Sequence, residues 1–263
     1  MKRVLITGTG SGIGKACKEI FLQNGFEVIG LDINRQEECQ NFRSYQVDIA
    51  NFDELSKIKN ELKGNNIIFD SIINVAGIHK MASFVETDLN KIKQVIDVNL
   101  MGPIAVNNLF HELLIEKGKI IIVTSEVASF DPLPFNGLYS VSKIALENYA
   151  QALRQELNLL VQKVITILPG AIETPLSKGS IDDTKCLADS TNLYKKESSK
   201  FVTITKKFMG KPLSPNKLAK KIYKVTLKKK IRLRYKIHHN FGLVLLSILP
   251  KRLQCYLIKL ILK

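Results

Sequence analysis

Residues 2–14, KRVLITGTGSGIG, run from a short apolar segment through a glycine-rich turn into a helical pattern that continues to about Gln23. Strand, glycine turn and helix, in this order, form the context in which such a motif binds a pyrophosphate. Gly8 would permit the tight turn, Gly12 would let the backbone approach the anion, and Gly14 would let the helix pack close to the strand. The stretch therefore predicts a dinucleotide-binding α/β domain, with the helix N-terminus facing the anion.

Further apolar runs alternate with helical patterns along the chain. Because strand and helix alternate six times, we expect a doubly wound parallel sheet (a Rossmann-type α/β fold) in a single domain. This domain would span residues 1–236, with a polar, irregular lid at about 176–212, and residues 237–263 would form a helical extension. The expected strands after the first are residues 26–31, 44–48, 70–77, 119–124, 164–168 and a short one at 231–237, and the expected helices are 51–62, 85–116, 138–160 and one beginning at Pro215.

Polar side chains follow several of the expected strands, where an open parallel sheet binds its ligand. Asp32 lies about twenty residues after the glycines, where a carboxylate bonds the ribose 2′-OH of NAD and repels the 2′-phosphate of NADP. Arg35 could oppose that preference, so NADP remains an alternative cofactor. Asp48 ends another strand and suggests contact with the adenine. The small residues of 74–77, NVAG, would let the cofactor lie close to the backbone.

Tyr139 and Lys143 stand at i and i+4 in an expected helix, which places both side chains on one face. An ammonium beside a phenol lowers a pKa that starts near ~10, and a phenol tuned in this way can exchange a proton with a carbinol oxygen. Taken alone, the pair is more simply an exposed Tyr and Lys. Ser125, however, directly follows the 119–124 strand. Asn99, inside a helix, would by itself indicate a satisfied structural amide.

Together these motifs resemble the short-chain dehydrogenase/reductase family, from Met1 to about Lys236. The matching segments are TGTGSGIG at 7–14, NVAG at 74–77, Asn99, Ser125, YSVSK at 139–143 and PGAIET at 169–174. The resemblance implies that Tyr139 is the acid/base, that Lys143 lowers its pKa and binds the nicotinamide ribose, that Ser125 orients the substrate oxygen, and that Asn99 holds a water in a proton relay. The residues that it implies for cofactor binding are Gly8, Ser11, Gly12, Ile13, Gly14, Asp32, Asp48, Asn74, Ala76, Gly77, Tyr139, Lys143, Pro169, Gly170, Ile172 and Thr174.

One spacing departs from the family pattern. The family serine usually lies about thirteen residues before the tyrosine, and Glu126 occupies that position here. We favour Ser125 with a one-residue extension of the following loop, because Ser125 directly ends the strand.

The basic charge is confined to one end of the chain. The formal net charge is +15, yet residues 206–263 hold 17 Lys and Arg and no Asp or Glu, while the other 205 residues hold 22 basic against 24 acidic side chains. The sequence therefore indicates that the C-terminal part meets something anionic or is a solvated face. We expect no nucleic-acid binding, because this part lacks a recognised motif.

The cysteines and the N-terminal sequence indicate the cellular compartment of the protein. The four cysteines lie far apart without metal-ligand spacing, which favours a reduced cytoplasmic protein without a metal site. The N-terminus has no long apolar segment typical of a secretory signal.

The C-terminus resembles the hydroxysteroid and retinol dehydrogenase-like members, which implies NAD(P)-dependent oxidation or reduction of a lipophilic secondary alcohol or ketone by a homo-oligomer. Alternatives are a 3-oxoacyl-thioester reductase and a non-catalytic, membrane-attached nucleotide-binding protein. Residues 241–249 are apolar but too short to span a bilayer. Leu253, Tyr256, Leu257, Leu260 and Ile261 form one helical face. Two hypotheses follow: the face packs on the domain or a partner subunit, or it makes a peripheral membrane contact.

Overall fold

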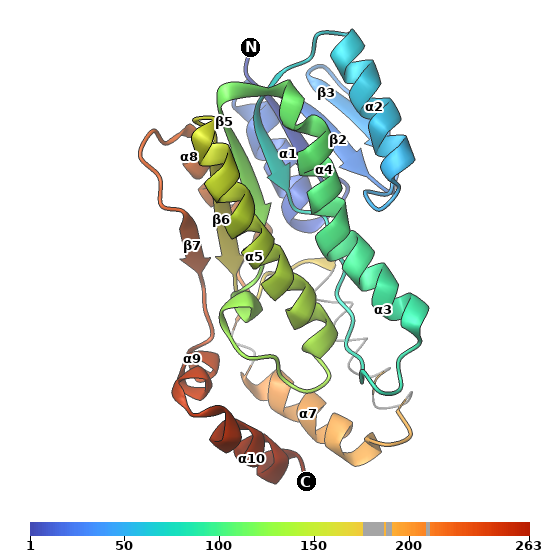
Figure 1. Cartoon of the computed structure of the whole chain (residues 1–263), viewed down its shortest axis with the longest axis vertical. Helices are drawn as coiled ribbons and strands as arrows, with labels where there is room; N and C mark the ends of the chain where they lie inside the picture. The colour runs from blue at the N-terminus through green and yellow to red at the C-terminus, as the bar shows by residue number, and fades with distance from the viewer. Residues whose placement is uncertain (176–186, 188–190, 209–210) are drawn as a thin grey trace.

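A seven-stranded parallel sheet forms the centre of the computed structural model, with strand order β3-β2-β1-β4-β5-β6-β7 (Figure 1). The strands are β1 (Arg3–Thr7), β2 (Glu27–Asp32), β3 (Phe42–Gln46), β4 (Phe69–Asn74), β5 (Leu114–Val123), β6 (Lys163–Pro169) and β7 (Arg234–Ile237). The structure describes residues 1–175, 187, 191–208 and 211–263. The chain reverses its order between β1 and β4, and at such a reversal the carboxyl ends of the strands open a crevice for ligands. The predicted doubly wound sheet is confirmed.

Helices cover both faces of the sheet because its central strands are apolar on both sides. One buried cluster joins the sheet to α2 (Phe52–Gly64), α4 (Gly102–Phe110) and α5 (Gly137–Leu159). The other joins it to α1 (Gly12–Gln23) and α8 (Pro215–Leu227). Neighbouring strand residues alternate between the clusters, as Leu5 and Ile6 do.

The long helix expected over 85–116 is interrupted. It divides into α3 (Leu89–Ile96), a π-helical turn at Asp97–Met101, α4 and a 3-10 turn at His111–Leu113. β5 also begins at Leu114, five residues before the predicted strand. The apolar period alone does not reveal a π turn, because one extra residue per turn shifts the pattern only slightly.

The stretch expected to be an irregular lid contains a regular helix, α7 (Lys195–Phe208). The remainder of that predicted lid lies largely outside the described residues, at 176–186, 188–190 and 209–210. Within the described part, Thr191 accepts a hydrogen bond from Tyr194 N at 3.0 Å and so helps to begin α7.

The C-terminal segment folds as two helices, α9 (Phe241–Ile248) and α10 (Lys251–Leu262), at the end of the molecule far from α2 (Figure 1). The stripe that begins at Leu253 does not pack on the described part of this chain, since Leu253, Tyr256, Leu260 and Ile261 are exposed, and its packing on a partner subunit stays a prediction. The helix instead turns Ile258 and Leu262 toward Phe201 of α7. None of the helices in the described part of the chain is both long and apolar enough to cross a membrane.

Candidate active site

The glycine turn after β1 brings three backbone segments into close contact. Gly8 has a φ of +76°, and a Cβ there would lie 3.0 Å from Ala76 Cα. A Cβ on Gly14 would lie 1.9 Å from the carbonyl oxygen of Gly8, so only glycine lets α1 pack this closely on the turn. Ser11 is the N-cap of α1 without a side-chain capping bond, which leaves the first N–H groups of the helix available for an anion.

Thr7 joins the end of β1 to the segment after β4 through hydrogen bonds, and sequence analysis did not identify this role. Its buried hydroxyl oxygen accepts hydrogen bonds from Val75 N and Ala76 N, both at 3.0 Å. A threonine directly before a glycine turn was the available signal. This link fixes the 74–77 segment against the turn, at the crevice where a dinucleotide would lie.

The carboxylate of Asp32 lies at the end of β2 and faces the same turn. It accepts hydrogen bonds from Gly10 N at 2.8 Å and from Asn34 N at 2.9 Å. Arg35, the residue that could favour a 2′-phosphate, is exposed. The carboxylate thus lies at the glycine turn, and its contact with a ribose stays a prediction.

Asn99 sits in the π turn and is fully buried. Its Oδ1 accepts from Ile78 N and its Nδ2 donates to Ile78 O, each at 2.8 Å, and Nδ2 also donates to Ser142 Oγ at 3.0 Å. The amide therefore acts as a structural clamp between the segment after β4 and helix α5. It also lies at the site, because a Cβ on Gly77 would be 3.1 Å from Asn99 Oδ1 and 3.4 Å from Lys143 Nζ.

Tyr139 and Lys143 lie one turn apart on α5 and converge with Ser125 at the carboxyl end of β5. Lys143 Nζ lies 5.8 Å from the centre of the Tyr139 ring and donates to Val123 O at 3.4 Å. The Ser125 hydroxyl is hydrogen-bonded to the Tyr139 side chain. Ser142 links this group to Asn99, because its hydroxyl donates to Tyr139 O at 2.7 Å.

The predicted lowering of the Tyr139 pKa by Lys143 stays a prediction, because burial, Ser125 and Glu126 are the causes that act on this phenol. Burial raises the pKa of Tyr139 to about 12, against a lowering by the Ser125 hydrogen bond and a further raising by the Glu126 charge. Burial also lowers the pKa of Lys143 to about 8. Desolvation disfavours both charged forms and outweighs their mutual attraction at this separation.

Ser125 and Glu126 point to different partners. Ser125 is buried, caps the 3-10 turn at Glu126–Ser129 and contacts Tyr139. The Glu126 carboxylate accepts from Asn240 N at 2.6 Å, and burial raises its pKa against this bond. The serine therefore lies beside the phenol, while the glutamate holds the beginning of α9.

His79 is a second residue that sequence analysis missed at this site. Its ring centroid lies 4.5 Å from that of Tyr139, and its Nε2 shares a hydrogen bond of 3.1 Å with Asn136 Oδ1. The available signal was its place two residues after Gly77.

The other residues implied for cofactor binding lie at or near the carboxyl ends of the strands. Thr174 is buried beside the turn, with its Cγ2 3.1 Å from a Cβ placed on Gly12, and Pro169 and Gly170 end β6 alongside β7. Asp48 is exposed after β3 and caps Ala50 N, and Asn74 donates to Asn107 Oδ1. Ile172 is buried and pairs with Leu213. The glycine turn and the N-terminus of α1 fit the pyrophosphate of a nicotinamide dinucleotide.

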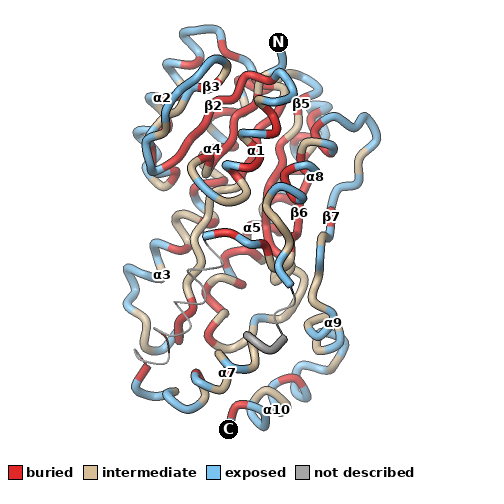
Figure 2. Tube along the Cα trace, turned by 180° about the vertical axis from the view of Figure 1, so that it is seen from behind, coloured by how far each residue is buried: buried red, intermediate tan, exposed pale blue. Residues whose placement is uncertain are grey.

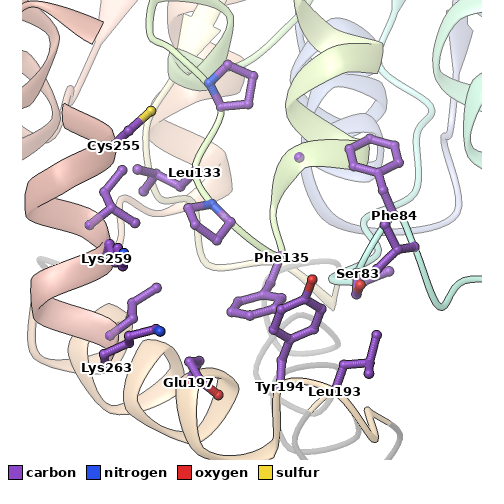
Figure 3. A pocket seen from close by; sticks show the side chains of 17 residues that line it. Ser83, Phe84, Leu133, Phe135, Leu193, Tyr194, Glu197, Cys255, Lys259 and Lys263 are labelled. Carbon is purple, nitrogen blue, oxygen red and sulfur yellow. The ribbon is translucent and has the colours of Figure 1, made fainter. Parts of the chain in front are cut away.

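An apolar cavity of about 670 Å³ opens beside the first turn of α5 (Figure 3). Leu133 and Phe135 enter it from the loop before α5, and Phe84 from the segment after β4, while Ile258 and Leu262 line it from α10. Gly137, two residues before Tyr139, is part of its wall. A cavity of this size accommodates a small organic molecule.

The sheet reverses its strand order between β1 and β4, a glycine turn follows β1, and Tyr139 lies beside the buried Ser125 and Lys143. These features define a nicotinamide-dependent class of dinucleotide-binding folds. The family model described as "short chain dehydrogenase" matches residues 2–185. The chain therefore belongs to the short-chain dehydrogenase family.

Curated relatives match about two thirds of the chain. A Schizosaccharomyces pombe protein named NADPH-dependent 1-acyldihydroxyacetone phosphate reductase is 34% identical over 182 residues, which cover 66% of this chain and 61% of that protein. The Danio rerio dehydrogenase/reductase SDR family member 7B is 26% identical over 68% of this chain and 64% of its own length. The matched region thus spans less than two thirds of either relative.

Solved structures share the fold over nearly the whole chain. A short-chain dehydrogenase family protein from Francisella tularensis superposes with a TM-score of 0.76 at 24% identity, covering 90% of this chain and 96% of that one. A 4-hydroxyisoleucine dehydrogenase mutant, in complex with NADH and succinate, superposes with a TM-score of 0.73 at 25% identity, covering 91% and 97%.

Proposed function

We propose that this chain is an NAD(P)-dependent oxidoreductase that interconverts a lipophilic secondary alcohol and its ketone. The observation that carries this proposal is the buried contact between Ser125 and Tyr139, with Lys143 Nζ 5.8 Å from the phenol ring. The apolar cavity beside Gly137 supports a lipophilic substrate. The Schizosaccharomyces pombe relative, named for an acylated keto phosphate, supports a substrate with an acyl chain.

The proton chemistry belongs to Tyr139. A nicotinamide held beside Tyr139 and Lys143 would supply the hydride chemistry, as the acceptor from the carbinol carbon in oxidation and as the donor to the carbonyl carbon in reduction. In oxidation the Tyr139 phenolate takes the hydroxyl proton as the C=O bond forms, and in reduction the phenol returns a proton to the carbonyl oxygen. Ser125 donates a hydrogen bond that orients the substrate oxygen, and Lys143, when protonated, stabilises the phenolate.

Asn99 and the residues around the glycine turn would hold the cofactor in place. Asn99 fixes the segment after β4 through both polar groups of Ile78, and we propose that it also orders a water between Lys143 and solvent. Gly8, Gly12 and the N-terminus of α1 would receive the pyrophosphate. Asp32 favours NAD(H), while the name of the Schizosaccharomyces pombe relative favours NADPH for that protein.

The test is a panel assay that follows NADH and NADPH absorbance with steroids, retinoids, long-chain alcohols, 1-acyldihydroxyacetone phosphate and 3-oxoacyl thioesters. We expect turnover with an apolar ketone or alcohol, and loss of about 10²–10⁴-fold in Tyr139→Phe with cofactor binding retained. Tyr45→Phe is the control, since the Tyr45 hydroxyl bonds Glu61 at the surface. Turnover with thioesters alone favours the acyl-thioester reductase. Cofactor binding without any turnover favours a nucleotide-binding protein.

We further propose a cytoplasmic homo-oligomer that contacts a membrane peripherally. The family resemblance supports the oligomer, and light scattering after size exclusion measures it. The membrane contact depends on the exposed apolar residues of the two C-terminal helices.

A further inference from the structure

The helices α9 and α10 expose seven large apolar side chains. Each of them is between 42% and 73% exposed, and we call the set the C-terminal apolar face. Its members are Phe241, Leu245, Ile248, Leu253, Tyr256, Leu260 and Ile261. Both helices lie at the same end of the molecule in Figures 1 and 2. Single exposed apolar residues are ordinary, but seven within 21 consecutive residues, 241–261, indicate an interaction surface.

Hydrogen bonds and packing hold this face outward. Asn240 N donates to the Glu126 carboxylate at 2.6 Å, and Asn240 Oδ1 caps α9 through Gly242 N at 2.8 Å. Gln254, a buried residue of α10, donates to Leu249 O at 2.8 Å and to Asp131 Oδ2 at 3.2 Å. The inner side of α10 makes these hydrogen bonds and packs on α7. The two helices therefore cannot turn their outer apolar residues inward without breaking these hydrogen bonds.

The charge of this region selects the partner. Residues 241–263 contain four basic and no acidic residues: Lys251, Arg252, Lys259 and Lys263. Lys251 pairs with Asp131 at 3.3 Å, Lys259 and Lys263 stand at the border of the cavity, and all four side chains remain exposed. A second copy docking through the same face would bring two cationic surfaces together, which is unfavourable. Apolar side chains bordered by long cationic ones match a lipid interface, where the lysine heads reach the anionic headgroups.

We propose that the C-terminal apolar face docks on the surface of an anionic lipid bilayer. Apolar side chains from both helices enter the interface, while the exposed basic residues of the α10 segment contact headgroups. Ile258 and Leu262, on the inner side of α10, line the cavity near Tyr139. Docking therefore places the cavity directly behind the bilayer-facing helix α10. The lipophilic substrate would then enter the cavity from the membrane, an inference that rests on the proposed function.

The test is flotation of the full chain with vesicles of neutral phosphatidylcholine and with vesicles that also contain phosphatidylserine, at low and high salt. We expect flotation with the anionic vesicles at low salt and weaker binding in the other arms. Combined Phe241→Ser, Ile248→Ser and Leu260→Ser should lower the vesicle partition coefficient about tenfold or more. The matched control combines Ile68→Ser, Leu89→Ser and Leu159→Ser, which remove comparable exposed apolar side chains elsewhere and should leave flotation unchanged.

Three results overturn the proposal. In the first, the full chain would remain with the unbound fraction in every arm, which would leave an acidic protein as the partner. In the second, the control triple variant would lose as much flotation as the test variant. In the third, the test variant would float normally but form a smaller oligomer in light scattering, which would make the face a subunit interface. Tyr139→Phe should float like the unchanged protein, because docking does not need turnover, so failure of docking and failure of the catalytic proposal are separately visible.

Discussion

The imidazole ring of His79 lies against the phenol ring of Tyr139, with the ring centroids 4.5 Å apart and the planes inclined by 52°. The two residues come from different elements, His79 from the segment after β4 and Tyr139 from the first turn of α5. Asn136, the N-cap residue of α5, joins them by its hydrogen bond to His79 Nε2. An ionisable ring therefore lies beside the phenol whose pKa burial raises to about 12.

We predict that His79→Phe shifts the pH dependence of alcohol oxidation to higher pH. The substitution keeps a ring against Tyr139 but removes its polar and ionisable atoms, so the phenolate becomes harder to form and its pKa rises. The acid limb of the profile of kcat/KM against pH should move upward by up to about one unit, measured with a soluble alcohol. His111→Phe is the control, since His111 bonds Gln162 away from the site. An unchanged acid limb in His79→Phe would mean that the imidazole only fills space.

We predict that Ser125→Ala and Glu126→Ala fail in different ways. Ser125 contacts the phenol, so its loss should lower kcat by about 10²-fold or more while α9 stays folded. Glu126 holds Asn240 N, so its loss should leave kcat largely intact and increase amide hydrogen exchange in α9. Steady-state kinetics and exchange on both variants make the comparison. A fall in kcat confined to Glu126→Ala would reassign the catalytic position to the glutamate.

We predict a higher kcat/KM with NADH than with NADPH. The Asp32 carboxylate is buried and held by Gly10 N and Asn34 N, so a 2′-phosphate would meet a fixed negative charge. Asp32→Ser should raise kcat/KM for NADPH relative to NADH by about tenfold or more. Arg35→Ser tests the opposing side chain and should lower the NADPH rate. A preference for NADPH in the unchanged protein would contradict the role given to Asp32.

The sheet was predictable because each of its strands leaves two signals in the sequence. Apolar runs such as residues 119–124 mark the core, and Gly8, Asp32 and Asn74 mark the strand ends that open on the crevice. The glycine at 14 could be assigned its role from spacing alone, and the 1.9 Å approach to Gly8 O agrees with it. Local sequence decides these features, since each depends on neighbours within one βα unit.

The remainder depends on contacts between distant segments. The π turn at Asn99 has no marker in the apolar period, and its function as a clamp appears only when Ile78 and Ser142 lie beside it. The side of α10 that packs on this chain could not be predicted, because the helix offers apolar residues on two sides. Ile258 and Leu262 meet α7, while Leu260 remains in solvent, and no helical periodicity distinguishes these sides.

The last prediction concerns the stability of the protein without cofactor. Burial lowers the pKa of Lys143 from 10.5 to about 8, so at neutral pH folding must bury a charge that the unfolded chain exposes to water. This difference corresponds to about 3 kcal/mol at pH 7, reduced by about 1 kcal/mol for the hydrogen bond to Val123 O. Lys143→Met, which keeps the apolar stem, should therefore raise the free energy of unfolding by about 1–3 kcal/mol while it removes turnover.

The difference in the free energy of unfolding between Lys143→Met and the unchanged protein should depend on pH. Below pH 8 the lysine is protonated in both the folded and the unfolded chain, so the advantage of Lys143→Met is complete. Between pH 8 and 10.5 the unfolded chain binds more protons, so the unchanged protein gains stability from this group as pH rises and the advantage declines. Urea denaturation of both proteins at pH 7 and pH 10 measures it, with the exposed Lys91→Met as the control. A difference that does not shrink at pH 10 would mean that the gain comes from packing, because only a buried charge is relieved by deprotonation.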